Sequence, residues 1–311
     1  MKKVMTVILS LLIIMTFAAC GSTTDEQLQQ PAEVSGIEES AEIEESGEEE
    51  LEQPAEQGQK TSGRKDTIPE TVLLDESGVR ITAKSLDFDA AVGPELKLLI
   101  ENNSGTDLTV QTRKTSVNGC MVDTMMSVDV ADGKKANDTL TFMGTDLELS
   151  GVRIIADMEF SFHIFTSSDW ETYLDTPQIC LMTSAAENYE YIYDDSGASA
   201  YEGEDVRVVV KGLTDTESIF GPSVVVYMEN NGQRDLTIQT RNVSVNGYMV
   251  DAIFSSEISA GKRAVDTITF LSSDLEENEI TQIESVELSL HIFDSETWDT
   301  ITDTDAVTIT F

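Results

Sequence analysis

Histidine, cysteine and basic residues are scarce in this chain of 311 residues, and each scarcity argues against certain classes of function. The two histidines, His163 and His291, are too few for a multi-histidine zinc site within one domain. Lys and Arg total 19 against 58 Asp and Glu, which gives a formal net charge of -39. Nucleic acid binding needs a basic surface that displaces phosphate counterions, so we expect no nucleic-acid partner. No catalytic constellation is present, and we expect a protein that is not an enzyme.

The chain also lacks a long hydrophobic run. The longest apolar stretch covers residues 4–19 and follows Lys2 and Lys3. It is shorter than the roughly 20 residues that a membrane span needs, so residues 1–20 are predicted to be a signal peptide. The end of this stretch, Phe-Ala-Ala-Cys, resembles the lipobox of bacterial lipoproteins. That resemblance implies a lipid on Cys20 that anchors the protein to the outer face of the bacterial cell membrane. An ordinary signal peptide, in which Cys20 is incidental, is the alternative.

Residues 21–70 lack aromatic side chains altogether, and residues 25–56 contain thirteen acidic residues without one Lys or Arg. Such a segment cannot bury enough apolar surface to fold, and its like charges repel one another. We therefore predict a disordered acidic linker over residues 21–70.

The rest of the chain contains a long internal repeat. Residues 108–123 read LTVQTRKTSVNGCMVD and residues 236–251 read LTIQTRNVSVNGYMVD, 128 positions later. The register holds from position 93 to position 183, with roughly 40 of about 90 positions identical. This duplication predicts one repeat over residues 71–183 and a second over residues 189–311. The segment ASAYEGED at 198–205 is interpreted as an insertion near the start of the second repeat.

Both repeats have the two-residue periodicity of β-strands. Phe160, Phe162 and Ile164 alternate with more polar residues, and the second repeat has the same pattern. The Asn-Gly pairs at 118–119 and 246–247 favour tight hairpins, and residues 145–151 and 273–279 are expected to form short helical turns. Seven or eight short strands in each repeat predict an all-β fold with two tandem antiparallel β-sandwiches.

Several residues that could form a site recur in both repeats. His163 and His291 occupy the same position of the same predicted strand, and are either ligand-facing or simply hydrogen-bonded on its outer side. The recurring cations are Arg113, Lys134, Arg241 and Lys262, which are candidates for a binding site or for cross-strand ion pairs.

Trp170 and Trp298 also occupy equivalent positions. We expect them to lie in the core or to cover one end of the sandwich, with an exposed recognition site as the alternative.

Cys120 and Cys180 occur in the first repeat only. They form either a disulfide or two separate thiols, and the second repeat, which lacks both, folds without such a bond. The acidic loops do not match the twelve-position calcium loop, so we expect no metal site and no cofactor.

The FAAC motif, the acidic linker, the Glu-Asn-Asn sequence at 101–103 and 229–231, and the FSFHIF strand together resemble surface lipoproteins of Firmicutes. Those proteins carry immunoglobulin-like domains similar in outline to the immunoprotective extracellular antigen. The resemblance implies two tandem immunoglobulin-like β-sandwiches and a non-enzymatic binding or structural module, with a protein or cell-wall partner. An accessory subunit of an envelope enzyme or transporter, and a calcium-dependent surface adhesion module, are the alternatives.

Overall fold

Alternating apolar and polar residues give each strand one buried face and one outward face. In β9 (Asp157–Thr166), Phe160 and Phe162 are buried, whereas His163 lies on the opposite side. The computed structural model describes residues 66–214 and 219–311. The predicted signal peptide, Cys20 and the predicted linker up to residue 65 lie outside the described residues.

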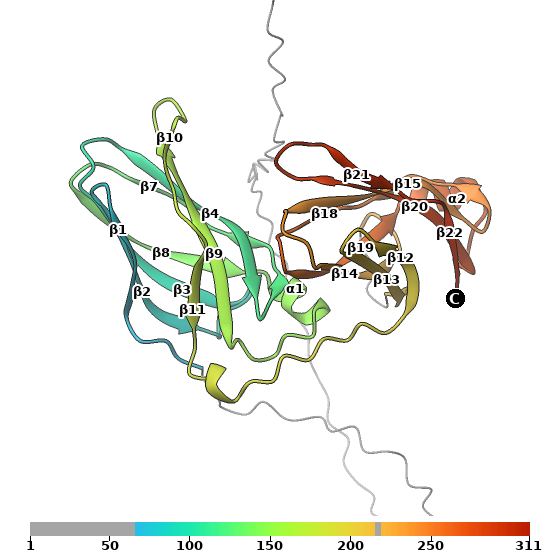
Figure 1. Ribbon diagram of the computed structural model, residues 1–311, viewed down its shortest axis with the longest axis horizontal. Coiled ribbons are helices and arrows are strands. Elements are labelled where there is room, and N and C mark those ends of the chain that lie inside the picture. Colours follow the sequence, from blue (N-terminus) through green and yellow to red (C-terminus); the bar gives the residue numbers. More distant parts are fainter. Residues whose placement is uncertain (1–65, 215–218) are drawn as a thin grey trace, which may run out of the picture. The chain divides into compact units, whose positions relative to one another are not determined.

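The first repeat contains eleven strands among its described residues. They are β1 (Thr71–Glu76), β2 (Val79–Asp87), β3 (Glu95–Asn102), β4 (Leu108–Val117), β5 (Cys120–Met121), β6 (Thr124–Met125), β7 (Ser127–Val130), β8 (Lys134–Phe142), β9, β10 (Thr172–Asp175) and β11 (Ile179–Met182). One sheet has the order β1-β2-β3-β8-β6, and in the other β9 and β4 are central, with β10, β11, β5 and β7 beside them. Figure 1 labels strands of both sheets, and their colours run from blue in β2 through green in β8 to yellow-green in β9.

The second repeat follows the same plan. Its strands are β12 (Ala198–Gly203), β13 (Val206–Leu213), β14 (Ser223–Asn230), β15 (Leu236–Val245), β16 (Tyr248–Met249), β17 (Ala252–Ile253), β18 (Ser255–Ile258), β19 (Arg263–Phe270), β20 (Ser285–Asp294), β21 (Thr300–Asp303) and β22 (Val307–Thr310). The strands β12-β13-β14-β19-β17 form one layer, and β15 and β20 are central in the other.

Each repeat encloses its own hydrophobic core. Phe142, Phe160 and Phe162 are buried in the first core, and Phe270 with Ile292 in the second. Burial of one aromatic or large aliphatic side chain contributes about 1.5–3 kcal/mol, so each cluster stabilises its own pair of sheets. The prediction of an all-β sandwich fold is confirmed.

The predicted reversals and helical turns also agree with the structure. Asn118 and Gly119 have φ values of 50° and 79°, which the hairpin between β4 and β5 requires. The short helices α1 (Gly144–Leu149) and α2 (Ser272–Glu277) occupy the two segments that lack strand character. A short 3-10 helix, η1 (Ala186–Asn188), lies in the segment that joins the repeats.

The interpretation of residues 198–205 as an insertion is wrong. The first six of these residues are β12, which pairs with β13 as β1 pairs with β2, including the same bulge near the start. The turn residues Glu204 and Asp205 therefore correspond to Ser77 and Gly78, at an offset of 127. The sequence comparison missed this relation because exposed edge strands and turns need only a general composition to be maintained.

Two buried asparagines tie the layers together at equivalent positions. Asn102 Nδ2 donates to the backbone oxygens of Thr106 and Val130 at 2.8 and 2.7 Å. Asn230 makes the same two bonds to Arg234 and Ile258 at 2.8 and 2.9 Å. Since each side chain is 1% exposed, these bonds satisfy carbonyl groups that water cannot reach. The second residue of each Glu-Asn-Asn sequence therefore has a structural role, since its side chain connects the two sheets.

Candidate binding site

The outward side of β9 and β20 carries a histidine-carboxylate pair in each repeat. His163 Nδ1 lies 2.5 Å from Asp175 Oδ1, and His291 Nδ1 lies 2.7 Å from Asp303 Oδ1. The imidazoles are only 12% and 13% exposed, so the carboxylates hold the rings in place against the sheet. The sequence prediction identified the histidines but missed the aspartates. Each aspartate follows its histidine by twelve residues in both repeats, and this shared spacing could have indicated the pair.

A pair of stacked aromatic rings continues this face in each repeat. Trp170 stacks on Phe165 with ring centroids 5.4 Å apart and an angle of 19° between the rings, and Trp298 stacks on Phe293 at 5.6 Å and 17°. The phenylalanines are buried, but Trp170 and Trp298 are 74% and 71% exposed. Of the expected positions, the core is wrong: each tryptophan covers a buried phenylalanine with one face and leaves the other face open.

The backbone that presents each tryptophan is in an unfavourable conformation. Trp170 has φ 64° and Trp298 has φ 65°, a left-handed region that costs a non-glycine residue about 1 kcal/mol or more. Their N–H groups donate to the carbonyl oxygens of Thr166 and Asp294 at 3.0 and 2.9 Å. The same strained residue in both repeats therefore positions the same exposed ring.

A hydrogen bond between the same two positions closes this loop in both repeats, although the threonine and the aspartate have exchanged places. In the first repeat Thr166 donates its hydroxyl to Asp169. In the second repeat the order is reversed, and Asp294 Oδ1 accepts from the backbone N–H of Thr297 at 3.0 Å. These hydrogen bonds lower the pKa of both carboxylates. The loop geometry is thus retained through a compensated change of sequence.

Polar side chains from the neighbouring strands complete the face. Gln111 lies opposite His163 on β4 and donates to Ser127 Oγ at 3.1 Å, and Gln239 donates to Ser255 Oγ at 3.2 Å. Gln111 is connected to the exposed Trp170 through His163, whose ring centroid lies 5.2 Å from that of Phe165, and through Phe165 itself. We call the outward surface that these residues form in each repeat the aromatic-histidine face. Its members are Gln111, His163, Phe165, Trp170 and Asp175 in the first repeat and Gln239, His291, Phe293, Trp298 and Asp303 in the second.

The four recurring cations, candidates for a binding site or for cross-strand ion pairs, have different surroundings. Arg241 lies 3.7 Å from Asp303 and so belongs to the face of the second repeat, while its counterpart Arg113 is exposed on β4. Lys262 pairs with Glu159 at 2.5 Å, whereas Lys134 is exposed to solvent. The structure therefore does not bring the cations together as one repeated site.

The proposed disulfide is not formed, because Cys120 and Cys180 are free thiols. Cys120 is buried beside the segment that joins the repeats, whereas Cys180 is exposed on β11. Burial raises the pKa of the Cys120 thiol to about 11, so it is a poor nucleophile at neutral pH.

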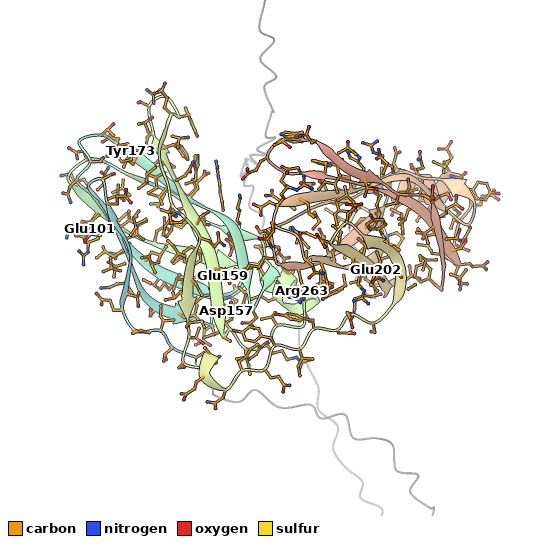
Figure 2. The ribbon with its side chains drawn as sticks, in the orientation of Figure 1. Glu101, Asp157, Glu159, Tyr173, Glu202 and Arg263 are labelled. Carbon is orange, nitrogen blue, oxygen red and sulfur yellow. The ribbon has the colours of Figure 1, made fainter. Side chains whose placement is uncertain are left out.

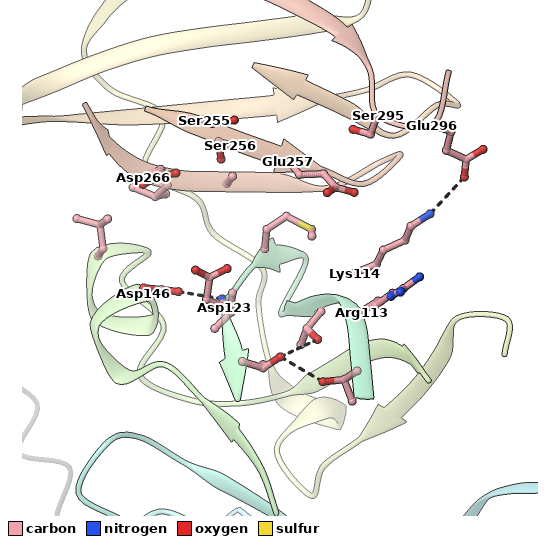
Figure 3. Close-up of a pocket in the computed structure, with 18 residues that line it drawn as sticks. Arg113, Lys114, Asp123, Asp146, Ser255, Ser256, Glu257, Asp266, Ser295 and Glu296 are labelled. Carbon is pink, nitrogen blue, oxygen red and sulfur yellow. Dashed lines mark hydrogen bonds and ion pairs between the residues drawn. The ribbon is translucent and has the colours of Figure 1, made fainter. Parts of the chain in front are cut away.

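A cavity of about 820 Å³ lies between the repeats, and its walls carry many acidic side chains (Figure 3). Asp123 N–H donates to Asp146 Oδ2 at 2.8 Å, and burial raises the pKa of both Asp123 and Asp266. Across residues 66–214 and 219–311, no three His, Cys, Asp or Glu side chains are grouped in a way that could hold a metal ion. In the same residues no helix is long and apolar enough to cross a membrane.

Comparisons with known proteins give no family. No family model and no curated protein matches the chain. Among solved structures, the YadV chaperone has a TM-score of 0.22 at 7% identity over 70% of this chain and 92% of that chain. The exo-chitosanase CsxA of Amycolatopsis orientalis has a TM-score of 0.22 at 12% identity over 70% of this chain and 25% of that chain. Similarities this low do not indicate the function of this chain.

Proposed function

We propose that this chain is a non-enzymatic lipoprotein, anchored through Cys20 outside the bacterial cell membrane, which binds its ligand through the aromatic-histidine face of each repeat. The observation that carries the proposal is the exposed tryptophan held at positive φ in both repeats. A fold that needed only to cover a phenylalanine would not require a large ring that remains more than two-thirds exposed. Exposed aromatic residues of this kind are typical anchors of binding surfaces.

The chemistry of the face favours a neutral, hydroxyl-rich ligand, which in the cell envelope means a glycan. The open side of the Trp170 ring offers a flat apolar surface to the C–H face of a sugar ring. Gln111 and the pair of His163 with Asp175 provide donors and acceptors for its hydroxyl groups. A strongly anionic polymer would be repelled by a chain of net charge -39.

Two such faces in one chain allow simultaneous binding to a repeating polymer. When the first face binds, the second face is held near the same strand, which raises its effective concentration. A polymeric ligand should therefore bind more tightly than the short oligosaccharide from which it is built.

The test is sedimentation of the purified full chain with insoluble cell-wall glycan. We expect the chain to co-sediment, and Trp170→Ala combined with Trp298→Ala to weaken binding at least about 30-fold, since a central aromatic anchor contributes about 2 kcal/mol or more. Phe311→Ala is the matched control, because Phe311 is 44% exposed and lies outside both faces. Equal binding by the double variant and the wild type would contradict the proposal.

A capture experiment addresses the alternative of an accessory subunit. If the immobilised full chain retained one stoichiometric envelope enzyme or transporter and no glycan, that function would replace the present one. Labelling with radioactive palmitate tests the anchor separately, and Cys20→Ser is expected to abolish the label.

A further inference from the structure

The two repeats contact each other through different surfaces. The hairpin of residues 119–121 in the first repeat, here called the docking hairpin, meets residues 262–264 in the second, here called the receiving edge. Arg263 N–H donates to Gly119 O at 3.0 Å, and Arg263 pairs with Cys120 in a parallel bridge between β19 and β5. Met121 packs against the hydrophobic core of the second repeat. The contact is thus head to tail: it joins two different surfaces of the repeats, whereas a symmetric contact would use the same surface of each.

Two ion pairs join the repeats beside this contact. Lys262 Nζ lies 2.5 Å from Glu159 Oε1, and Lys114 Nζ lies 2.6 Å from Asp235 Oδ2. The Lys262 side chain is only 15% exposed, so its charge is paired in a largely dry environment. Glu159 on β9 and Arg263 on β19 are labelled in Figure 2, and Lys114 appears in Figure 3.

A head-to-tail contact between duplicated domains leaves one counterpart of each surface unused. The counterpart of the docking hairpin is residues 247–249, here called the open hairpin. Its Tyr248 and Met249 are 52% and 65% exposed, whereas Cys120 is 2% exposed. Two adjacent exposed apolar side chains at a hairpin tip are typical of a contact surface.

The counterpart of the receiving edge is residues 134–136, here called the open edge. Lys134 and Lys135 are exposed, while the equivalent Lys262 and Arg263 are partly covered by the first repeat. The strand continues in both cases with an alanine, which is 3% exposed at position 264 and only partly buried at position 136. The open edge therefore has the shape of the receiving edge without its cover.

One of the two ion pairs at the internal contact has a counterpart of opposite charges on the unused surfaces. The counterparts of Lys262 and Glu159 are Lys134 and Glu287, which retain opposite signs. Glu287 is exposed on β20 beside the open hairpin. The counterparts of Lys114 and Asp235 are Asn242 and Asp107, an amide and a carboxylate that can still form a hydrogen bond.

We propose that the open hairpin of one copy docks on the open edge of a second copy, so that chains associate head to tail. Met249 then takes the place of Met121, and Glu287 of one copy pairs with Lys134 of the next. Because the contact is not symmetric, each added copy again leaves one open surface at either end, and rows of copies result.

The contact between copies should be weaker than the contact inside the chain. Within the chain the Arg263 guanidinium lies 4.1 Å from the ring centroid of Tyr193, which belongs to the segment joining the repeats. Two separate copies are not held together by such a joining segment. Anchoring to a membrane raises the local concentration and would compensate for the missing link.

The test is zero-length carbodiimide cross-linking of the full chain in detergent, using equal amounts of unlabelled and nitrogen-15-labelled protein at about 0.15 M salt, where the screening length is about 8 Å. We expect a Lys134–Glu287 cross-link that joins labelled to unlabelled peptide and increases with protein concentration. The Lys262–Glu159 cross-link should form only within one copy. It therefore reports that the fold and the internal contact are intact.

Variants identify the surface. Met249→Asp should reduce the mixed cross-link at least about tenfold, because docking would bury an unpaired charge. Met182→Asp is the control, since Met182 is 52% exposed on β11, away from both unused surfaces. Lys134→Glu alone or Glu287→Lys alone should lose the mixed cross-link between these positions, because carbodiimide joins an amine to a carboxylate. A chain with both substitutions should form it again.

Absence of the mixed Lys134–Glu287 cross-link, while the internal Lys262–Glu159 cross-link forms, would overturn the proposal. Mixed cross-links confined to other positions would also overturn it, because a different surface would then join the copies.

Discussion

Replacing Asn118 by alanine should destabilise the first repeat strongly. The Asn118 side chain donates to Ile154 O at 2.7 Å and accepts from the N–H groups of Ala156 and Asp157 at 2.8 and 3.2 Å. Asn118 is 1% exposed, so water cannot replace these bonds. Each partner left unsatisfied costs about 1–3 kcal/mol, and alanine at φ 50° costs about 1 kcal/mol more. We expect a loss of about 4 kcal/mol in the free energy of unfolding.

Asn246 provides a matched comparison in the second repeat. It makes the same three bonds, to Gln282 O, Glu284 N–H and Ser285 N–H, at 2.8, 2.9 and 3.0 Å, and has the same φ of 50°. However, it is only partly buried, and water can reach the groups that alanine would leave unpaired. Asn246→Ala should therefore cost about 1–2 kcal/mol.

Urea unfolding monitored by tryptophan fluorescence can separate the two repeats, because each contains one tryptophan. In a Trp298→Phe background only Trp170 reports, and in a Trp170→Phe background only Trp298 reports. The midpoint should fall much further for Asn118→Ala than for Asn246→Ala. Equal losses, or a loss under about 1 kcal/mol for Asn118→Ala, would refute the argument that burial decides the cost.

Three further predictions concern buried groups. Iodoacetamide at pH 8 should label Cys180 in the native protein and leave Cys120 unlabelled until urea is added, as peptide mass mapping would show, because burial raises the pKa of Cys120 to about 11. Burial also raises the pKa of Asp266, so its ionisation weakens the folded state at neutral pH. Asp266→Asn should raise the urea midpoint at pH 7, and this gain should disappear below the unfolded carboxyl pKa of about 3.8; a gain that persists at pH 3 would contradict the electrostatic cause. Phe162→Ala should cost about 3–5 kcal/mol, because Phe162 is 1% exposed in the first core, and an unchanged unfolding midpoint would exclude this packing.

The strands and turns could be predicted because they depend on neighbouring residues. The alternation of Phe160, Phe162 and Ile164 predicts a strand, which is β9, and both Asn-Gly pairs form hairpins. The edge strand β12 was missed, because its exposed residues carry no strong two-residue pattern.

The candidate site was only partly predictable. The recurrence of His163 and His291 drew attention to the correct strand. Their carboxylate partners lie twelve residues away, across the hairpin from β9 to β10 and its equivalent, and only the register of that pairing brings them to the histidines. The exposure of Trp170 depends on a loop conformation that propensity does not indicate.

The sequence by itself determined the duplication, the β character and the turn positions, because periodicity and turn chemistry act over a few residues. The tertiary structure alone decided which of two nearly identical segments is covered. The hairpin sequences SVNGCM and SVNGYM differ at one position, yet Met121 packs on the neighbouring repeat and Met249 is 65% exposed. Whether a side chain is buried depends on which other part of the protein packs against it, and that part is formed by residues far away in the chain.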